Sequence, residues 1–96
     1  MTAAELKRQC EAARPGLQWG DPQNDLRSAW VSAPVSDGSR ISVQASTDRV
    51  SVSAYWFGSE TRRQVVGHGV TADGALDALE AELRAIEETT GRARLA

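Results

Sequence analysis

Two neighbouring segments of this chain place apolar residues at every second position, and this pattern restricts the possible folds more than any other feature. In segment 40–46 the apolar residues are Ile41, Val43 and Ala45. Segment 49–57 continues the pattern with apolar residues at its even positions: Val50, Val52, Ala54 and Trp56. A period of two is typical of β-strands buried on one face. The sequence therefore predicts an antiparallel hairpin with one face in a core and the other in water.

The turns between strands set the predicted register. A two-residue turn at Thr47-Asp48 makes each apolar residue of one segment face an apolar residue of the other. The predicted pairs are Ala45 with Val50, Val43 with Val52, and Ile41 with Ala54. A second turn near Ser59-Glu60 leads into a strand over 61–70. Its predicted pairs are Phe57 with Arg62, Tyr55 with Gln64, Ala54 with Val65, and Ser51 with His68.

A helix is predicted on each side of the strands. Thr2 and Glu5 form a capping box that starts a helix over 2–14, and Pro15-Gly16 ends it. Thr71 is the predicted N-cap of a second helix over 72–89. The apolar residues of this second helix recur at helical spacing: Ala72, Ala75, Leu76, Leu79, Leu83 and Ile86.

These elements give the order α-β-β-β-β-α in a single domain over residues 1–96. Strands are expected at about 26–33, 40–46, 49–57 and 61–70, with a further short extended piece near Leu17 and a frayed tail over 91–96. Hairpin connections imply an antiparallel meander sheet. We therefore expect an α+β fold in which both helices cover one face of the sheet.

The composition argues against several classes of function. The chain has one histidine and one cysteine, too few for a metal site or a disulfide. Cys10 falls on the apolar face of the first helix, and no nucleophile motif accompanies His68. We expect no catalytic, cofactor or metal site and therefore no enzyme. We also expect a cytoplasmic protein, because the sequence shows neither an apolar membrane span nor a secretory signal. It is expected to be either a monomer or a homodimer.

Acidic residues gather on one stripe of the second helix, although the net charge of the chain is only −2. The predicted partner-binding residues are Asp73, Asp77, Glu80, Glu87 and Glu88. Carboxylates one helical turn apart lie about 5 to 6 Å from each other, a spacing close to that of backbone phosphates. The stripe is either a solvated helix face or a mimic of nucleic acid. On the second interpretation, Asp77→Lys with Glu80→Lys should abolish partner binding and leave the fold intact.

The outer face of the predicted sheet is the alternative functional surface. Its candidate residues are Arg40, Tyr55, Phe57, Arg62, Gln64 and His68. Exposed aromatic side chains beside arginine suit stacking on bases or a protein interface. The aromatic residues can equally serve to stabilise the sheet through cross-strand contacts.

The junction of the last strand and the second helix, Gly67-His68-Gly69-Val70-Thr71, resembles the closing element of double-stranded-RNA-binding domains. In that family the RNA contacts come largely from lysines at the start of the helix. The corresponding residues here are Ala72, Asp73 and Leu76, so the resemblance implies a similar fold without the phosphate-binding charge. The same junction, from Thr71 to Leu76, resembles that of HicB-type antitoxins, which implies an acidic, RNA-excluding role for the helix.

Three functions follow from these surfaces. The leading hypothesis is a small non-enzymatic inhibitor of the phage or mobile-element type, similar to an anti-CRISPR or an antitoxin. Such a protein would occupy a nucleic-acid-handling partner through its acidic helix. The second hypothesis is a nucleic-acid-binding module that uses the outer sheet face. The third is an assembly role as a homodimer, joined through an edge strand or the Tyr55 and Phe57 patch.

Overall fold

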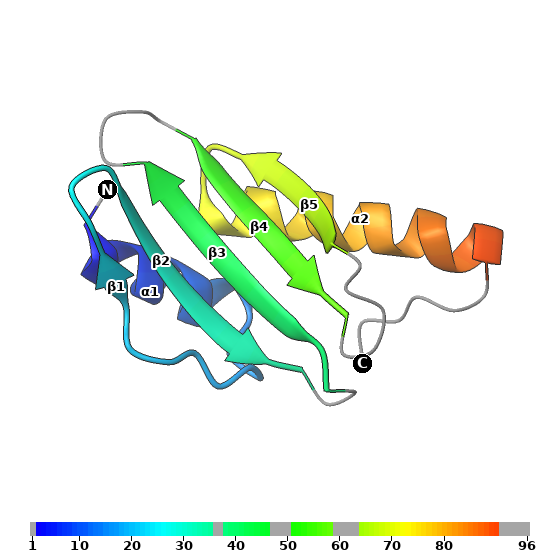
Figure 1. Cartoon of the computed structure of the whole chain (residues 1–96), viewed down its shortest axis with the longest axis horizontal. Helices are drawn as coiled ribbons and strands as arrows, with labels where there is room; N and C mark the ends of the chain where they lie inside the picture. Colours follow the sequence, from blue (N-terminus) through cyan, green and yellow to red (C-terminus); the bar gives the residue numbers. More distant parts are fainter. Residues whose placement is uncertain (1, 36–37, 47–50, 59–63, 91–96) are drawn as a thin grey trace.

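The computed structural model describes residues 2–35, 38–46, 51–58 and 64–90, with side chains up to residue 86. Its elements are α1 (Ala3–Ala13), β1 (Gln23–Asn24), β2 (Ser28–Pro34), β3 (Arg40–Ser46), β4 (Val52–Phe57), β5 (Gln64–Gly69) and α2 (Ala72–Thr90). The strands form one antiparallel sheet in the order β1-β2-β3-β4-β5, and both helices pack on one face of it (Figure 1). The predicted α+β meander is confirmed.

Both predicted N-caps are present, and they explain where the helices begin. The hydroxyl of Thr2 accepts a hydrogen bond from the backbone N–H of Glu5 at 3.2 Å. The hydroxyl of Thr71 accepts one from the N–H of Gly74 at 3.1 Å. Each hydroxyl satisfies an amide of the first turn that has no partner inside its helix.

The register of both central hairpins differs from the prediction by two residues. The observed partners of β3 and β4 are Ile41 with Trp56, Val43 with Ala54, and Ala45 with Val52. Those of β4 and β5 are Phe57 with Gln64, Tyr55 with Val66, Ala54 with Gly67, and Ser53 with His68. A slip of two residues keeps every side chain on its face, so alternation could not detect the error. The predicted turns at 47–48 and 59–60 lie outside the described residues.

The short extended piece expected near Leu17 is not a strand, and the additional strand of the sheet lies further along the chain. β1 consists of Gln23 and Asn24 and pairs with β2 through a tight turn. In this turn the carboxylate of Asp25 accepts hydrogen bonds from the N–H groups of Arg27 and Ser28, both at 2.8 Å. These bonds lower the pKa of Asp25. Leu26 was expected to begin a strand and is instead 98% exposed at the tip of the turn.

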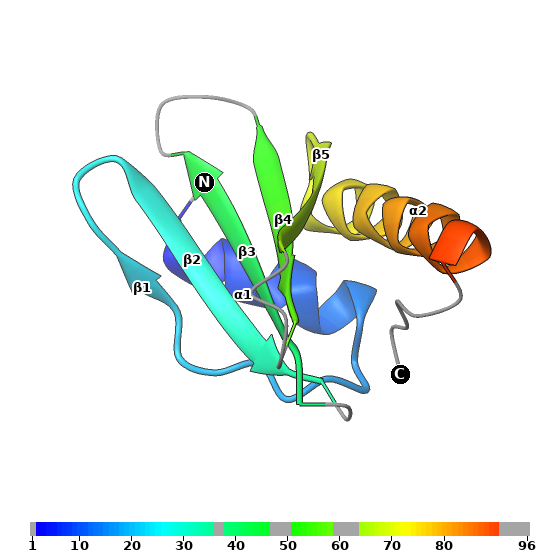
Figure 2. The same cartoon turned by 45° about the vertical axis from the view of Figure 1, so that its right-hand side comes forward.

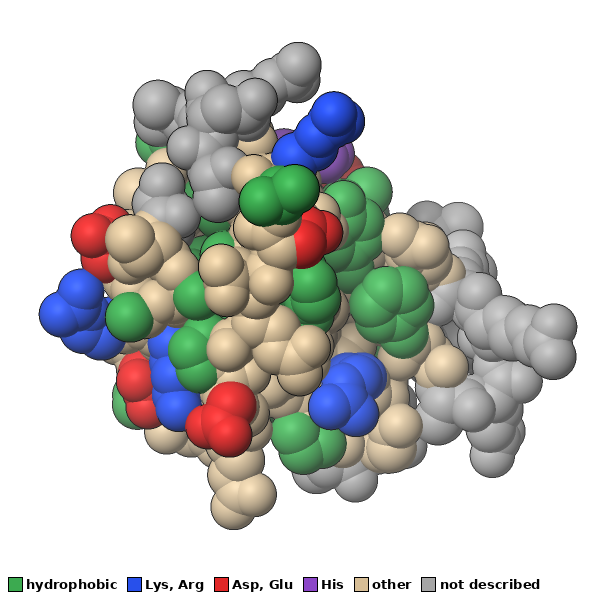
Figure 3. Space-filling model, turned by 60° about the vertical axis from the view of Figure 1, so that its left-hand side comes forward, with side chains coloured by type: hydrophobic (Ala, Val, Ile, Leu, Met, Phe, Trp, Pro, Cys, Tyr) green, Lys and Arg blue, Asp and Glu red, His purple; other side chains and the backbone are tan. Residues whose placement is uncertain are grey.

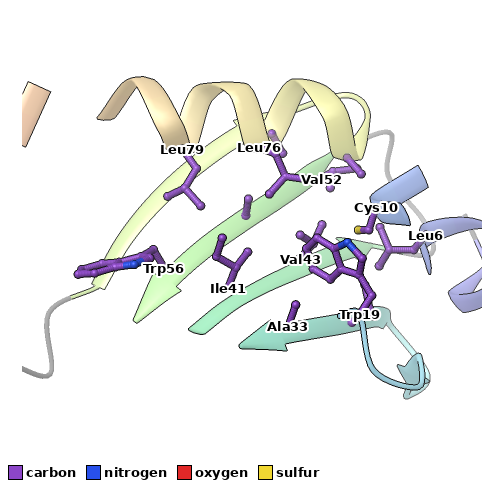
Figure 4. Close-up of a cluster of buried hydrophobic side chains, with 14 of the residues drawn as sticks. Leu6, Cys10, Trp19, Ala33, Ile41, Val43, Val52, Trp56, Leu76 and Leu79 are labelled. Carbon is purple, nitrogen blue, oxygen red and sulfur yellow. The ribbon is translucent and has the colours of Figure 1, made fainter. Parts of the chain in front are cut away.

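The core lies between the sheet and the two helices (Figure 4). Leu6 and Cys10 of α1, together with Leu76 and Leu79 of α2, pack toward the strands and are at most 1% exposed. Burial, with a smaller contribution from Glu11, raises the pKa of Cys10 to about 12. The thiol is therefore a packing group rather than a nucleophile, as its place on the apolar face of the helix predicts.

The two buried indole rings at the margins of the core each have a hydrogen-bond partner. The Nε1–H of Trp19 donates to the carbonyl oxygen of Arg14 at 3.1 Å. The Nε1–H of Trp56 donates to the hydroxyl of Ser39 at 3.0 Å, and Ser39 is only 3% exposed. Tryptophan thus contributes apolar area to this small core without leaving an unpaired donor.

Gly67 lets α2 lie directly against β5 (Figure 2). A Cβ at this position would meet the backbone of Leu79 and lie 2.7 Å from the carbonyl oxygen of Ala75. The contact is between main chains, so no side-chain rotation would relieve it. The glycine-rich strand end therefore fixes the helix on the inner face and leaves the opposite face of the sheet uncovered by either helix.

Candidate functional site

The uncovered side of the sheet, which we call the open face, carries three rows of side chains that cross all four strands from β2 to β5. Strand register places one residue each of β2, β3, β4 and β5 in every row. The rows are Pro34–Arg40–Phe57–Gln64, Ser32–Ser42–Tyr55–Val66 and Trp30–Gln44–Ser53–His68. The structure thus brings together five of the six predicted surface residues: Arg40, Tyr55, Phe57, Gln64 and His68. The sixth, Arg62, lies outside the described residues.

Three aromatic side chains lie on the open face. The rings of Tyr55 and Phe57 are nearly parallel, at 15°, with centroids 6.3 Å apart. Phe57 is 40% exposed; its partner on β5 is Gln64 rather than the predicted Arg62, and its partner on β3 is Arg40. Trp30 is half-buried at the other end of the face. The aromatic side chains therefore span the face from β2 to β4.

The remaining groups of the open face are mostly uncharged and polar. The hydroxyl of Ser53 lies 2.9 Å from Nδ1 of His68, and the Ser32 hydroxyl donates to that of Ser42 at 3.2 Å. Strands β2 to β5 contain no aspartate or glutamate within their described bounds. Figure 3, which brings the β1 and β2 side forward, shows hydrophobic side chains among uncharged polar ones, with most charged groups nearer the margins.

The β2 residues of this surface, Trp30, Ser32 and Pro34, were not assigned to it from the sequence. The sequence contained a pattern that could have assigned them, because Ala29, Val31 and Ala33 occupy alternate positions. All three of these residues are buried in the structure. Their alternation places Trp30 with the serines of the opposite face. In this strand the small residues lie in the core, and the large aromatic residue lies on the open face.

The acidic stripe of α2 has a partner within the same chain. The guanidinium of Arg14, at the C-cap of α1, reaches Glu80 at 2.6 Å, Asp77 at 2.8 Å and Asp73 at 3.4 Å. The hydrogen bond that Nε of Arg14 donates to Glu80 is the main cause that raises the pKa of Arg14, while burial works against it. The side chain of Arg14 is only 22% exposed. Three of the five predicted partner-binding carboxylates are therefore joined to α1.

This contact changes what the acidic stripe offers to a partner. The side chains of Asp73 and Asp77 remain 66% and 65% exposed, but Glu80 is 25% exposed and held by Arg14. The side chains of Glu87 and Glu88 lie outside the described residues. The inhibitor hypothesis stays a prediction. Its proposed test needs correction, because Glu80→Lys would place a cation beside Arg14 and destabilise the contact between the helices.

Three other features would point to a different function: a metal site, a membrane-spanning helix or a catalytic serine–histidine arrangement. They contain no group of three or more metal-ligating side chains that converge. Neither helix in the described part of the chain combines the length and apolar character that a membrane crossing requires. Ser53 and His68 share a hydrogen bond on an exposed strand pair, without a third group that orients the imidazole in any contact of the described residues.

No model of a protein family, no curated protein sequence and no solved structure matches this chain. The resemblances of the junction at Gly67 to double-stranded-RNA-binding domains and to HicB-type antitoxins stay predictions. The geometry of the open face and of the acidic stripe is the basis for the function proposed below.

Proposed function

We propose that this protein is a non-enzymatic module that binds single-stranded nucleic acid on the open face of its sheet. One observation carries the proposal: three aromatic side chains share a surface with Arg40, and strands β2 to β5 carry no aspartate or glutamate within their described bounds. Every base has a π-face, so aromatic side chains on a sheet bind single strands with little dependence on sequence. A duplex hides these faces, which makes the single strand the fitting partner.

The distribution of charge supports the same conclusion. The net charge of −2 opposes binding to a polyanion only if the carboxylates face it. On this protein Asp73, Asp77 and Glu80 lie on α2 and contact Arg14, while Arg40 is the one Lys or Arg within the described bounds of β2 to β5. Phosphate therefore approaches the protein from its least acidic side.

Stacking supplies most of the affinity on this proposal. An aromatic residue in such a platform contributes about 1 to 3 kcal/mol per base. Each phosphate contact on a single strand adds a slope of about −0.7 to the dependence of log K on log salt. With Arg40 as the cation on the described part of the face, the salt dependence should be shallow. A protein driven by phosphate contacts would behave in the opposite way.

The test is a fluorescence anisotropy titration with labelled single-stranded RNA and DNA of about ten nucleotides. Tyr55→Ala should weaken binding by about 1 to 3 kcal/mol, and Phe57→Ala by a similar amount. The matched control is Leu26→Ala, because Leu26 is an exposed apolar residue at the β1–β2 turn. Circular dichroism spectra and melting temperatures verify that each variant is folded. Equal affinity of wild type and Tyr55→Ala would contradict the proposal.

Absence of binding to every oligonucleotide would also reject the proposal, and light scattering would then decide between the other uses of this surface. A dimer that Phe57→Arg dissociates would assign the open face to self-association. A monomer would favour the hypothesis that the acidic stripe of α2 binds a partner.

A further inference from the structure

One row of the open face differs from the other two because polar side chains follow one another on three adjacent strands. Gln44 of β3 is opposite Ser53 of β4, which is opposite His68 of β5. Trp30 of β2 is opposite Gln44 and continues the row on the other side, where it is opposite Gln23 of β1. We call Gln44, Ser53 and His68 the polar row. Strands lie about 4.8 Å apart, so the polar row spans about 10 Å, the scale of one base with its sugar.

The polar row offers both donors and acceptors to a ligand. The amide of Gln44 is exposed and carries two N–H donors and a carbonyl acceptor. Ser53 holds Nδ1 of His68 at 2.9 Å, which restrains the ring and leaves Nε2 as the ring nitrogen for a ligand. The indole of Trp30 gives an adjacent surface on which a base can stack. A base is recognised by an aromatic side chain that stacks on its flat face, together with neighbouring donors and acceptors that hydrogen-bond to its edge.

The residue types in this row distinguish among the bases. Arginine and lysine select guanine through O6 and N7, and aspartate or glutamate accepts from N4 of cytosine. Neither kind of side chain occurs in the polar row. Glutamine pairs with adenine through one donor and one acceptor, and serine hydroxyls adapt to either kind of partner. Adenine is therefore the base that the chemistry of the row fits best.

We infer that the polar row gives this protein a preference for adenine, with Gln44 as the residue that determines it. The inference rests on the proposed binding of single strands. In this division of roles Tyr55 and Phe57 bind any base by stacking. The row that contains Trp30 and Gln44 selects adenine over the other bases. The open face then has a general subsite on β4 and a selective subsite across β2, β3, β4 and β5.

Titrations with A10, C10 and U10 oligoribonucleotides test the inference. Wild type should bind A10 at least about fivefold more tightly than C10 or U10, the lower end of what one bidentate pair provides. Gln44→Ala should bring the three affinities within about twofold, mainly through weaker binding of A10. Tyr55→Ala should weaken all three by a similar factor and keep the preference.

The matched control is Gln64→Ala, which removes an exposed amide from the same face in a different row. It should leave the preference for A10 unchanged. Equal binding of the three oligonucleotides by wild type would overturn the inference while the proposed function stands. Loss of preference in Gln64→Ala as well as Gln44→Ala would also overturn it, because selection would then not belong to the polar row. Failure of wild type to bind any of them would reject the proposed function itself.

Discussion

Gly67→Ala tests the contact that fixes the architecture of this domain. The added methyl group would lie 2.7 Å from the carbonyl oxygen of Ala75 and 2.7 Å from Cα of Leu79, and closer still to the Leu79 nitrogen. These are backbone atoms of α2, where ordinary Cβ contacts begin at 3.4 Å. The helix as a whole must therefore move away from β5.

The cost of that movement follows from what α2 buries. Its side chains Ala72, Ala75, Leu76, Leu79 and Leu83 are at most 2% exposed. A gap of roughly 1 Å beneath a packed side chain forfeits up to about half of its dispersion energy. Overpacking alone costs about 1 to 3 kcal/mol, so we expect Gly67→Ala to lower the free energy of unfolding by about 3 kcal/mol or more. For a domain of this size the melting temperature should fall by at least about 12 °C.

Urea and thermal unfolding followed by circular dichroism measure this effect. The matched control is Gly74→Ala in the first turn of α2, where the new Cβ would have ordinary contacts, the nearest 3.4 Å from the Thr71 hydroxyl. Alanine is the better helix former there, so this variant should be more stable than wild type by about 0.5 to 1 kcal/mol. If Gly67→Ala melts within a few degrees of wild type, the close approach of α2 and β5 is refuted.

Three further changes test other parts of the fold. Ser39→Ala removes the acceptor of the buried Trp56 N–H and should lower the free energy of unfolding in urea by about 1 to 3 kcal/mol. An equal loss of free energy in a Trp56→Phe background would contradict the hydrogen bond. Arg14→Met should cost about 1 to 3 kcal/mol. Arg84→Met should cost under about 0.5 kcal/mol, because the Arg84 side chain is 74% exposed and its pair with Glu80 is 4.0 Å long. Equal losses in these two variants would refute the role of Arg14. Because burial raises the pKa of Cys10 from 9.0 to about 12, the unfolded chain releases this proton first and stability should fall as pH rises above 9. Urea midpoints of wild type and Cys10→Ala at pH 8 to 10 check this, and parallel pH profiles would contradict it.

The features that sequence predicted correctly are those that neighbouring residues determine. Thr2 and Thr71 cap their helices because a hydroxyl reaches an amide three residues away. The alternation in β3 and β4 places Val43 and Val52 in the core because successive side chains of a strand point to opposite faces. The face of each residue, and with it most of the open face, was therefore predictable.

The pairing of those strands was not predictable from the same pattern. A slip of two residues preserves the faces, and the apolar positions of β3 and β4 are similar enough that Val43 fits opposite Val52 or Ala54. The Thr47-Asp48 dipeptide is not a favoured hairpin turn, so turn chemistry gave no independent constraint. The consequence for the site is specific: Arg40 is opposite Phe57, and His68 is opposite Ser53.

The contacts of Arg14 show a second limit of sequence patterns. Arg14 and Glu80 are 66 residues apart, and nothing in either local sequence specifies that they meet. They meet because both helices pack on one face, where the C-terminal end of α1 lies against the first half of α2. A stripe of carboxylates that looked free in the sequence is in part the attachment between helices.

These contacts separate the net charge of the molecule from the charge that a ligand would meet. A helix is about 10 Å thick, and the Debye length at physiological ionic strength is about 8 Å. Carboxylates beneath the sheet and paired with Arg14 are therefore largely screened from a ligand on the open face. The local surface of aromatic rings, amides, hydroxyls and Arg40 then decides which partner binds. For this reason an acidic protein with few basic residues on its open face can favour a single strand, provided that the strand is held by its bases more than by its phosphates.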